Sequence, residues 1–503
     1  MKKFLKNKIL FYMIFILSPA ALLLLLSYVH KCNAFIGKPV WSDEVSYWRE
    51  VFSFANCGTK TGYYGIGEIL PKIGQFSTHG FFPSFFYFPF AKILGWHNNS
   101  IVLANLFFTI ICFTLLIFFI KPSVKQSIGL ILLYLLYPPI LLYASTSMTE
   151  IINYGLLSLF FVFFYLYTTI APPHPQHYIK NLFLTLMILV GTICSFYRIT
   201  YVVLFILPII LLYELRSYKF MLLTILGIFY SGCLYLVNSL FVAPFSDGVL
   251  YKVLNSGSLK TSIHLILINI QSNIVRLIDI KNGEHTEVFF RIFYIIAIIL
   301  YFSLMFFRTT IVKNKKDFLS LSFRDKIEKF YLMQFILLLL PLCLIIVAYD
   351  IFDFRDYRTL SPFLWASFLN LILFRRNITF TAILPFFILF FGASLFFLPA
   401  GILYYNGVPM NEIRYTQKEE QDFPLINEFV KYNESATDPF ENTMVTNNID
   451  FELWSKLHPG IGIEFGVPQE NLKSKYILIN TNLEIHGYTF KRITEFGYLY
   501  IKN

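Results

Sequence analysis

Long apolar segments joined by short polar ones run along most of the chain, and this feature limits its fold more than any other. A helix needs roughly 20 mostly apolar residues to cross about 30 Å of hydrocarbon, and many segments meet that requirement. Of the 503 residues, 56% are hydrophobic and only 14% are charged, which is more apolar surface than one water-soluble core could bury. The sequence therefore predicts an all-α polytopic membrane bundle.

About 11 segments have the length and composition of transmembrane helices. They lie near residues 9–29, 101–120, 128–143, 151–170, 182–196, 199–213, 220–242, 288–307, 330–348, 360–374 and 380–399. Polar side chains interrupt a further apolar segment at residues 263–280, so we expect an amphipathic helix on the outer leaflet there rather than a span. The first span follows a basic amino terminus and has no clear cleavage site, so we expect it to remain as an uncleaved anchor.

The basic residues mark one side of the membrane. Lys and Arg occur in alternate loops, at residues 2–8, 121–125, 180, 216–219, 308–329 and 375–376. Cytoplasmic loops carry an excess of such residues, so the amino terminus is predicted to be cytoplasmic. This pattern also accounts for the net charge of +11 without a nucleic-acid partner, because the charges do not follow one face. We expect a multi-pass protein of a bacterial inner membrane.

The opposite side receives two long loops and the end of the chain. The first outer loop spans residues 31–99 and the second spans residues 243–287, and both belong to a predicted transmembrane domain of residues 1–402. After this domain, charged residues, turn signals and strand-like segments replace the apolar runs. Residues 403–503 are therefore predicted to form a small extracytoplasmic α/β or α+β domain.

Several common chemistries leave no trace in the sequence. It contains no P-loop, no dinucleotide fingerprint, no G-x-S-x-G nucleophile elbow and no HExxH metal pair. Of the six cysteines, only Cys32 and Cys57 lie in the first outer loop, where a disulfide could form. The function must then be sought in polar residues at the outer membrane surface.

An acidic pair stands near the start of the first outer loop, in the segment PVWSDEVSYWREVF. Asp43 and Glu44 cost free energy at a membrane interface unless they are solvated or paired. On a helix, Asp43 would share a face with Tyr47 and Glu50. Another face would rest on the bilayer through four apolar residues, Trp41, Val45, Trp48 and Phe52. The pair could aim an acid into the loop above the bundle, or could simply begin an interfacial helix, where acids suit the dipole.

Charged residues also occur at other outward positions. Glu150 heads a helix, where it could act only as a cap, and Arg198 lies in a short turn, where it could reach lipid headgroups. Arg355 and Arg358 could pair with neighbouring aspartates. Arginines on this side are nevertheless an exception to the charge rule, and Arg is well suited to holding a phosphate.

The remainder of the first loop is rich in aromatic residues and contains His79, in the segment STHGFFPSFFYFPF. Its glycines and prolines predict a fixed surface rather than a flexible linker. Aromatic residues interleaved with polar ones suit sugar rings, and they equally suit a belt at the membrane interface. Both interpretations stay open.

Five short motifs, with the order of the spans, resemble the GT-C superfamily of membrane glycosyltransferases. The motifs are WSDEVSYW, HGFFPSFFYF, SMTE, FYRITYVVLFILP and RDYRTLSPFL. Members of the superfamily include protein O-mannosyltransferases, oligosaccharyltransferases and lipid A aminoarabinose transferases, which use polyprenyl-phosphate-linked sugars. The sequence lacks the WWD-type motif of oligosaccharyltransferases, which argues against asparagine-linked transfer.

The resemblance implies a role for each outer polar residue. Asp43 would match the catalytic acid of the first loop, with Glu44 beside it, and Glu150 would match a second acid. Substrate contacts would come from five residues, His79, Tyr47, Arg198, Arg355 and Arg358. The implied partners are a polyprenyl-phosphate sugar donor, the lipid bilayer and a glycan, lipid or protein acceptor. Metal dependence varies in the superfamily, so the use of a divalent cation stays open.

Such a site would perform one direct displacement with inversion at the sugar, in which a carboxylate accepts a proton and cations steady the departing lipid phosphate. Two other interpretations remain. An O-antigen-type polymerase or ligase would rely on arginines in outer loops and would tolerate loss of Asp43. A transporter or flippase for a lipid-linked glycan would place charged residues in mid-membrane and show paired halves, and the sequence indicates neither.

Overall fold

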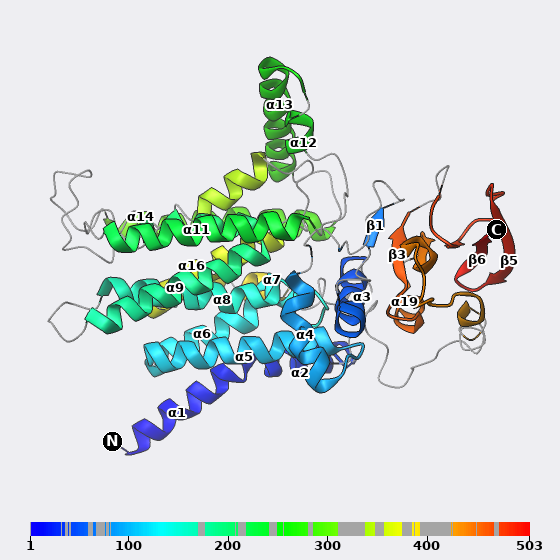
Figure 1. Ribbon diagram of the computed structural model, residues 1–503. Coiled ribbons are helices and arrows are strands. Elements are labelled where there is room, and N and C mark those ends of the chain that lie inside the picture. Colours follow the sequence, from blue (N-terminus) through cyan, green and yellow to red (C-terminus); the bar gives the residue numbers. More distant parts are fainter. Residues whose placement is uncertain are drawn as a thin grey trace.

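The chain folds into a long helical bundle followed by a small sheet, as seen in the computed structural model (Figure 1). The structure describes residues 2–31, 33–35, 39, 42–58, 64–66, 76, 80, 82–169, 177–206, 208–209, 218–240, 249–254, 256–279, 285–309, 338–347, 357–374, 385–386, 388–392, 424, 426–448, 450–466 and 472–503. These residues confirm the prediction of a mostly helical chain that ends in a small sheet-containing part.

The bundle is made of apolar helices that run side by side (Figure 1). They are α5 (Ser100–Ile120), α6 (Val124–Leu136), α8 (Ile151–Thr169), α9 (His177–Tyr197), α11 (Tyr218–Ser239), α14 (His285–Thr309) and α16 (Tyr357–Phe374). The start of α6 shows why a helix begins where it does. The side chain of Ser123 accepts a hydrogen bond from the Gln126 N–H, and the Gln126 side chain accepts one from the Ser123 N–H at 2.7 Å.

Three of the predicted spans are interrupted. The first is bent by 62° between Lys8–Ile16 and Ser18–His30, where a proline, Pro19, opens α2 (Ser18–His30) after α1 (Lys2–Ile16). The span predicted at residues 128–143 breaks before α7 (Pro138–Tyr143), because proline has no N–H and disfavours helical geometry in the residue before it. The span predicted at residues 199–213 begins with a 3-10 helix, η3 (Ile199–Phe205).

The number of membrane spans stays a prediction. By length and composition, two described helices, α5 and α13 (Leu259–Ile278), could cross a membrane, and the bent pair at the amino terminus would make a third. Of the span predicted at residues 330–348, residues 338–347 are described and form an apolar helix, whereas most of the span predicted at residues 380–399 lies outside the described residues. In Figure 1, α13 and the short α12 (Val249–Leu254) project from the bundle across the direction of α11 and α14.

A six-stranded sheet forms the carboxy-terminal part, in the order β1-β3-β2-β4-β6-β5. The strands of this part are β2 (Thr443–Thr446), β3 (Gly462–Phe465), β4 (Tyr476–Ile479), β5 (Tyr488–Thr494) and β6 (Gly497–Lys502). β2 pairs in parallel with β3 and β4, and a short helix, α19 (Phe451–Lys456), connects β2 to β3. β4, β6 and β5 pair antiparallel, so the sheet combines an α/β half with a terminal hairpin. A 3-10 turn, η6 (Pro439–Asn442), precedes β2.

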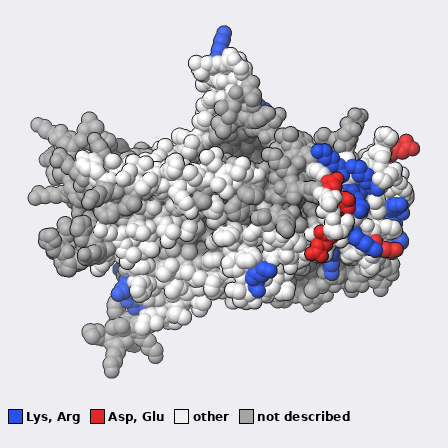
Figure 2. All heavy atoms as spheres, viewed as in Figure 1, with Lys and Arg blue, Asp and Glu red and all other residues white. Residues whose placement is uncertain are grey.

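The sixth strand comes from the first outer loop. β1 (Tyr64–Ile66) lies at the edge of the sheet and pairs in parallel with β3, with Tyr64 opposite Ile463 and Ile66 opposite Phe465. The described charged residues gather on the sheet-containing end of the molecule, whereas the bundle face in Figure 2 is almost entirely uncharged in its described part. The polar end of the molecule therefore includes both the first outer loop and the carboxy-terminal domain.

Candidate active site

Helix α3 (Ser42–Cys57) carries the acidic pair and lies between the end of the bundle and the sheet (Figure 1). Tryptophans from the first loop fix it in place. The indole N–H of Trp48 donates to the His97 carbonyl at 2.8 Å, and that of Trp96 donates to the Trp48 carbonyl at 3.0 Å. Trp96 and His97 follow α4 (Phe82–Leu94), so both helical parts of the loop are tied together. Much of the remaining loop, for which we predicted a fixed surface, lies outside the described residues, so that expectation stays a prediction.

The apolar stripe of α3 packs on protein, not on the bilayer. Val45 is fully buried, and Trp48 is 3% exposed. The Trp48 ring lies edge-on to Phe451 of the carboxy-terminal domain, with centroids 4.9 Å apart. The expectation that this stripe rests on lipid was therefore wrong, because helical spacing shows that a face is buried but does not identify what buries it.

The turn between α7 and α8 presents Glu150 toward α3. Three side chains from different elements hold the backbone of this turn. Glu44 accepts from the Ser147 N–H at 2.6 Å, Asn105 donates to the Met148 carbonyl at 2.8 Å, and the Tyr197 hydroxyl donates to the Thr149 carbonyl at 3.1 Å. Buried polar groups held in this way give the turn one defined shape.

Four charged residues from four segments meet at this turn. Arg358 Nη2 donates to Asp43 Oδ2 at 3.0 Å, and Arg358 Nε lies 3.3 Å from Glu150 Oε1. Arg198 pairs with the same Glu150 oxygen and donates from Nη1 to Thr359 Oγ1 at 2.7 Å. The result is a chain of alternating charge, in which Glu150 joins two arginines and Arg358 joins two acids.

Exposure differs sharply along this chain of charges. The Glu150 side chain is 1% exposed and that of Arg198 is 8% exposed, whereas the Asp43 side chain is 45% exposed. Burial alone raises the pKa of Glu150, but Arg358 and Arg198 outweigh burial and hold that pKa below its usual range. Glu150 is therefore an anion at neutral pH that contacts both arginines, and Asp43 is the exposed acid of the cluster.

Tyr47 lies one turn beyond Asp43 on α3 and is 1% exposed. Burial, together with the Glu150 and Asp43 carboxylates, raises the pKa of Tyr47 well above its ordinary value. The tyrosine is therefore a neutral phenol beside the charged residues. This placement agrees with the predicted shared face of Asp43 and Tyr47, and it can supply one hydroxyl to a bound substrate.

The structure brings together most of the predicted site. Asp43, Glu150, Arg198 and Arg358 form one cluster, with Glu44 beside it on the supporting turn. Two further predicted residues, His79 and Arg355, lie outside the described residues. Cys57 carries a free thiol, and Cys32 also lies outside the described part of the chain.

Sequence reasoning missed the residues that hold the cluster together. Thr359 could have been found from the sequence, because it directly follows the candidate residue Arg358. Asn105 and Tyr197 lie inside apolar runs, where an amide is a signal for a buried hydrogen bond. Within the described residues, no group of three or more His, Cys, Asp or Glu could hold a metal ion. Metal dependence stays open.

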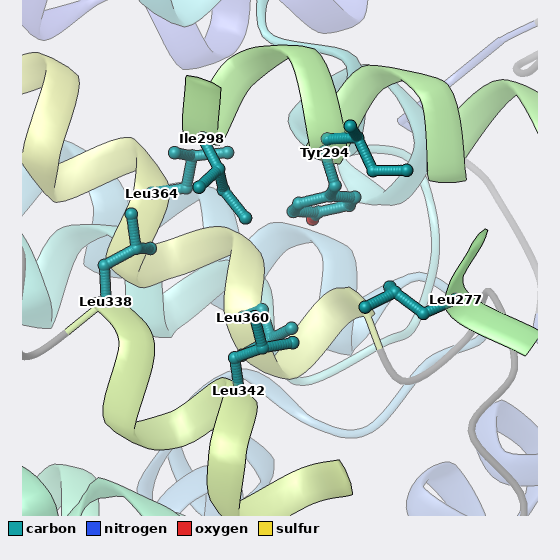
Figure 3. A pocket seen from close by; sticks show the side chains of 8 residues that line it. Leu277, Tyr294, Ile298, Leu338, Leu342, Leu360 and Leu364 are labelled. Atoms are coloured by element: carbon teal, nitrogen blue, oxygen red, sulfur yellow. The ribbon is translucent and has the colours of Figure 1, made fainter. Parts of the chain in front are cut away.

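An apolar pocket lies beside α16. Leu360 and Leu364 of α16 line it together with Leu277 of α13, Tyr294 of α14 and other apolar residues, among them Leu338 and Leu342 (Figure 3). The empty volume is about 380 Å³. Leu360 follows Arg358 by two residues, and residues two apart on a helix do not face each other, so the pocket lies on a different side of α16 from the Arg358 side chain.

Two solved structures resemble the chain over nearly its whole length. The archaeal oligosaccharyltransferase AglB from Archaeoglobus fulgidus, in complex with an inhibitory peptide and a dolichol-phosphate, matches 94% of this chain and 69% of its own at 10% identity, with a TM-score of 0.50. ArnT from Cupriavidus metallidurans, bound to undecaprenyl phosphate, matches 96% of this chain and 97% of its own at 10% identity, with a TM-score of 0.47. Neither a protein-family model nor a curated protein sequence matches the chain.

The structural likeness to AglB identifies the fold class. The chain shares its fold with AglB, an oligosaccharyltransferase, which agrees with the resemblance of its short motifs to the GT-C superfamily. At 10% identity the likeness reaches no further than the fold, so the activity has to be argued from the site itself.

Proposed function

We propose that the protein is an integral-membrane glycosyltransferase that moves a sugar from a polyprenyl-phosphate carrier to an extracytoplasmic glycan, lipid or protein acceptor. The observation that carries this proposal is the contact of half-exposed Asp43 with Arg358, at 3.0 Å, within a cluster that also contains Glu150 and Arg198. A half-exposed acid and neighbouring guanidinium groups are what an enzyme needs to accept a proton from a hydroxyl and to bind the phosphate of a lipid-linked sugar.

Arg358 is suited to hold the phosphate. Its Nη2 and Nε face Asp43 and Glu150, and within the described part of the chain Nη1 has no partner. A guanidinium group can bind carboxylate and phosphate oxygens at once, because its N–H groups point outward in one plane. The dolichol-phosphate in the AglB complex fits the same class of ligand.

Asp43 is suited to act as the general base. The acceptor hydroxyl would lose its proton to the Asp43 carboxylate as its oxygen forms a new bond to the anomeric carbon. The bond from that carbon to the phosphate oxygen would break, and the polyprenyl phosphate would leave with the electron pair, steadied by Arg358 and Arg198. One such displacement inverts the anomeric carbon. Glu44 supports the site through Ser147, and Tyr47 could contact the sugar.

His79 and Arg355 remain proposed substrate contacts. The amino terminus is proposed to be cytoplasmic, and the carboxy-terminal domain is proposed to lie outside the cytoplasm, where the lipid-linked donor would meet its acceptor. A bacterial inner membrane is the proposed location. These assignments follow from the charge pattern of the loops and the positions of the motifs.

The test is an activity assay with purified protein in detergent or nanodiscs. The protein is incubated with a panel of radiolabelled polyprenyl-phosphate sugars and with cell-envelope acceptors, and both labelled product and released polyprenyl phosphate are measured. The proposal predicts acceptor-dependent release of polyprenyl phosphate in equal amount to the product. Movement of an intact lipid-linked sugar across proteoliposomes without a new glycosidic bond would instead identify a flippase. Turnover of diphosphate-linked donors alone would favour the polymerase or ligase alternative.

A further inference from the structure

A buried arginine joins α3 to the carboxy-terminal domain. Arg49 is 4% exposed and donates four hydrogen bonds to backbone carbonyls of that domain. Nη1 donates to Trp454 and Leu457, each at 2.8 Å, and Nη2 donates to His458 at 2.5 Å and to Ile461 at 2.9 Å. These four contacts connect residues more than 400 positions apart in the sequence, so no local feature explains them.

Three of the four carbonyls, those of Trp454, Leu457 and His458, lie at the end of a short helix, and the fourth directly precedes β3. α19 ends at Lys456, and the last carbonyls of a helix have no partner within it. A cation is favoured there by the helix dipole, and only a planar guanidinium group offers enough fixed N–H groups for four acceptors. Among the described residues Arg49 contacts no carboxylate, so the carbonyls alone compensate its charge. Burial lowers the pKa of Arg49 to about 9, which leaves it charged at neutral pH.

Two further contacts join the same surfaces. The Trp48 ring packs edge-on against Phe451 at the start of α19. β3 begins at Gly462, directly after the last carbonyl that Arg49 binds, and pairs with β1 of the first loop. The first outer loop therefore holds both ends of the segment from α19 to β3.

We infer that Arg49 is a positioning residue that locks the carboxy-terminal domain onto α3 and thereby holds Asp43 in its working orientation. Arg49 lies six residues after Asp43, or about 9 Å along the helix at about 1.5 Å per residue. On the bundle side, α3 is held through Asp43 and Glu44 by Arg358 and Ser147. On the other side, α3 is held by the four hydrogen bonds from Arg49, which we call the lock. The expected effect of Arg49 on catalysis rests on the proposed function, whereas the contact between Arg49 and the carboxy-terminal domain does not.

The inference predicts that Arg49 affects the rate of sugar transfer but not the affinity for the donor. Arg198 and Arg358 belong to the bundle, so the affinity for the lipid phosphate should not depend on Arg49. Asp43 belongs to α3, so the rate of sugar transfer should depend on Arg49. Small displacements of a reacting group cost large factors in rate, and we expect Arg49→Met to lower kcat about tenfold or more. Arg49→Lys should restore part of the rate, because an ammonium group has three donors for four carbonyls.

The experiment compares wild type, Arg49→Met, Arg49→Lys and a matched control, Arg492→Met, which removes an exposed arginine from β5 of the same domain. It measures kcat for sugar transfer, the Kd for polyprenyl phosphate alone, and amide hydrogen exchange of residues 454–465. We expect faster exchange, lower kcat and an unchanged Kd in Arg49→Met, intermediate values in Arg49→Lys and no change in the control. If Arg49→Met does not insert, Arg49→Lys carries the comparison with the same expected directions.

The outcomes separate the lock from the activity. Unchanged exchange at residues 454–465 would overturn the lock, whether or not the protein transfers sugar. Faster exchange with an unchanged kcat would overturn the positioning role. A kcat and a Kd that worsen by the same factor would show general damage instead. If the wild type transfers no sugar to any acceptor, the proposed function and the catalytic consequence of Arg49 both fail, and the exchange result decides the lock alone.

Discussion

Arg358→Met is the substitution that most directly separates a structural from a functional role for the charged cluster. Methionine keeps an unbranched apolar chain of similar length but removes all five N–H donors. In wild type, Arg358 contacts both Asp43 and Glu150, so the substitution leaves the cluster with two acids and one arginine. Arg198 still contacts Glu150, and Asp43 is left without its described partner.

The expected magnitude follows from these contacts. A hydrogen bond to a charged group contributes about 1.5–3 kcal/mol, so a lost guanidinium–phosphate contact should raise the Kd for polyprenyl phosphate about 10- to 150-fold. The Asp43 contact is half exposed and should contribute less than about 1 kcal/mol to stability. The contact with buried Glu150 contributes more, since an uncompensated charge at a buried site is costly.

The double variant Arg358→Met with Glu150→Gln restores neutrality, because it removes one positive and one negative charge. The glutamine oxygen can still accept from Arg198. We therefore expect the double variant to recover thermal stability in detergent but not the affinity for polyprenyl phosphate. Lys125→Met, which removes an exposed lysine at the start of α6, should change neither quantity.

Binding is measured with radiolabelled polyprenyl phosphate, and stability is measured by thermal unfolding of the same preparations. The reasoning fails if Arg358→Met binds the lipid phosphate as tightly as wild type. It also fails if the double variant regains full affinity, because Arg358 would then only neutralise Glu150.

Three further predictions follow from other parts of the structure. Arg358 and Arg198 lower the pKa of Glu150, so the Glu150 carboxylate should stabilise the fold fully above the unfolded pKa of about 4.3 and lose this effect as pH falls below that value. Thermal unfolding from pH 7 to 3.5 should show this loss in wild type and not in Glu150→Gln. A Cβ at Gly155 of α8 would lie 2.8 Å from the Cβ of Cys112 on α5, so Gly155→Ala should lower the free energy of unfolding by about 1–3 kcal/mol. The control is Gly232→Ala on α11, where a Cβ would meet nothing within 4 Å and the free energy of unfolding should not fall. Alkaline phosphatase fused after Asn503 should be active and a fusion at Lys316, a position outside the described residues, should be inactive; the reverse pattern would refute the orientation.

The charge and apolar patterns predicted where polar residues lie, but not which of them meet. Asp43, Glu150, Arg198 and Arg358 were all chosen because each stands at the outer end of an apolar run. Their contacts join positions up to 315 residues apart, and sequence spacing carries no information about such pairs. The sequence suggested only local partners for Arg358, yet it contacts one acid on α3 and another in the turn before α8.

The errors in the fold have similar causes. The break before Pro138 could have been predicted, since proline disfavours helical geometry in the preceding residue. Two features could not have been predicted: the packing of Trp48 against Phe451 of the carboxy-terminal domain, and the pairing of β1 with β3. Both depend on contact between two ends of the chain, and a three-residue strand such as β1 is too short to show a pattern. Arg49 was overlooked for the same reason, because its partners are backbone carbonyls.

The central claim is that Asp43 accepts a proton during sugar transfer, and Asp43→Asn tests it most directly. Asparagine keeps the size of the side chain and can still accept from Arg358, but it cannot take up a proton at neutral pH. We predict that transfer falls about 100-fold or more while polyprenyl phosphate still binds. Glu44→Gln should cost less, because its amide oxygen can still accept from the Ser147 N–H. If Asp43 only begins an interfacial helix, Asn should serve almost equally well, since both cap helices with similar strength. Wild-type transfer rates in Asp43→Asn membranes would contradict the mechanism.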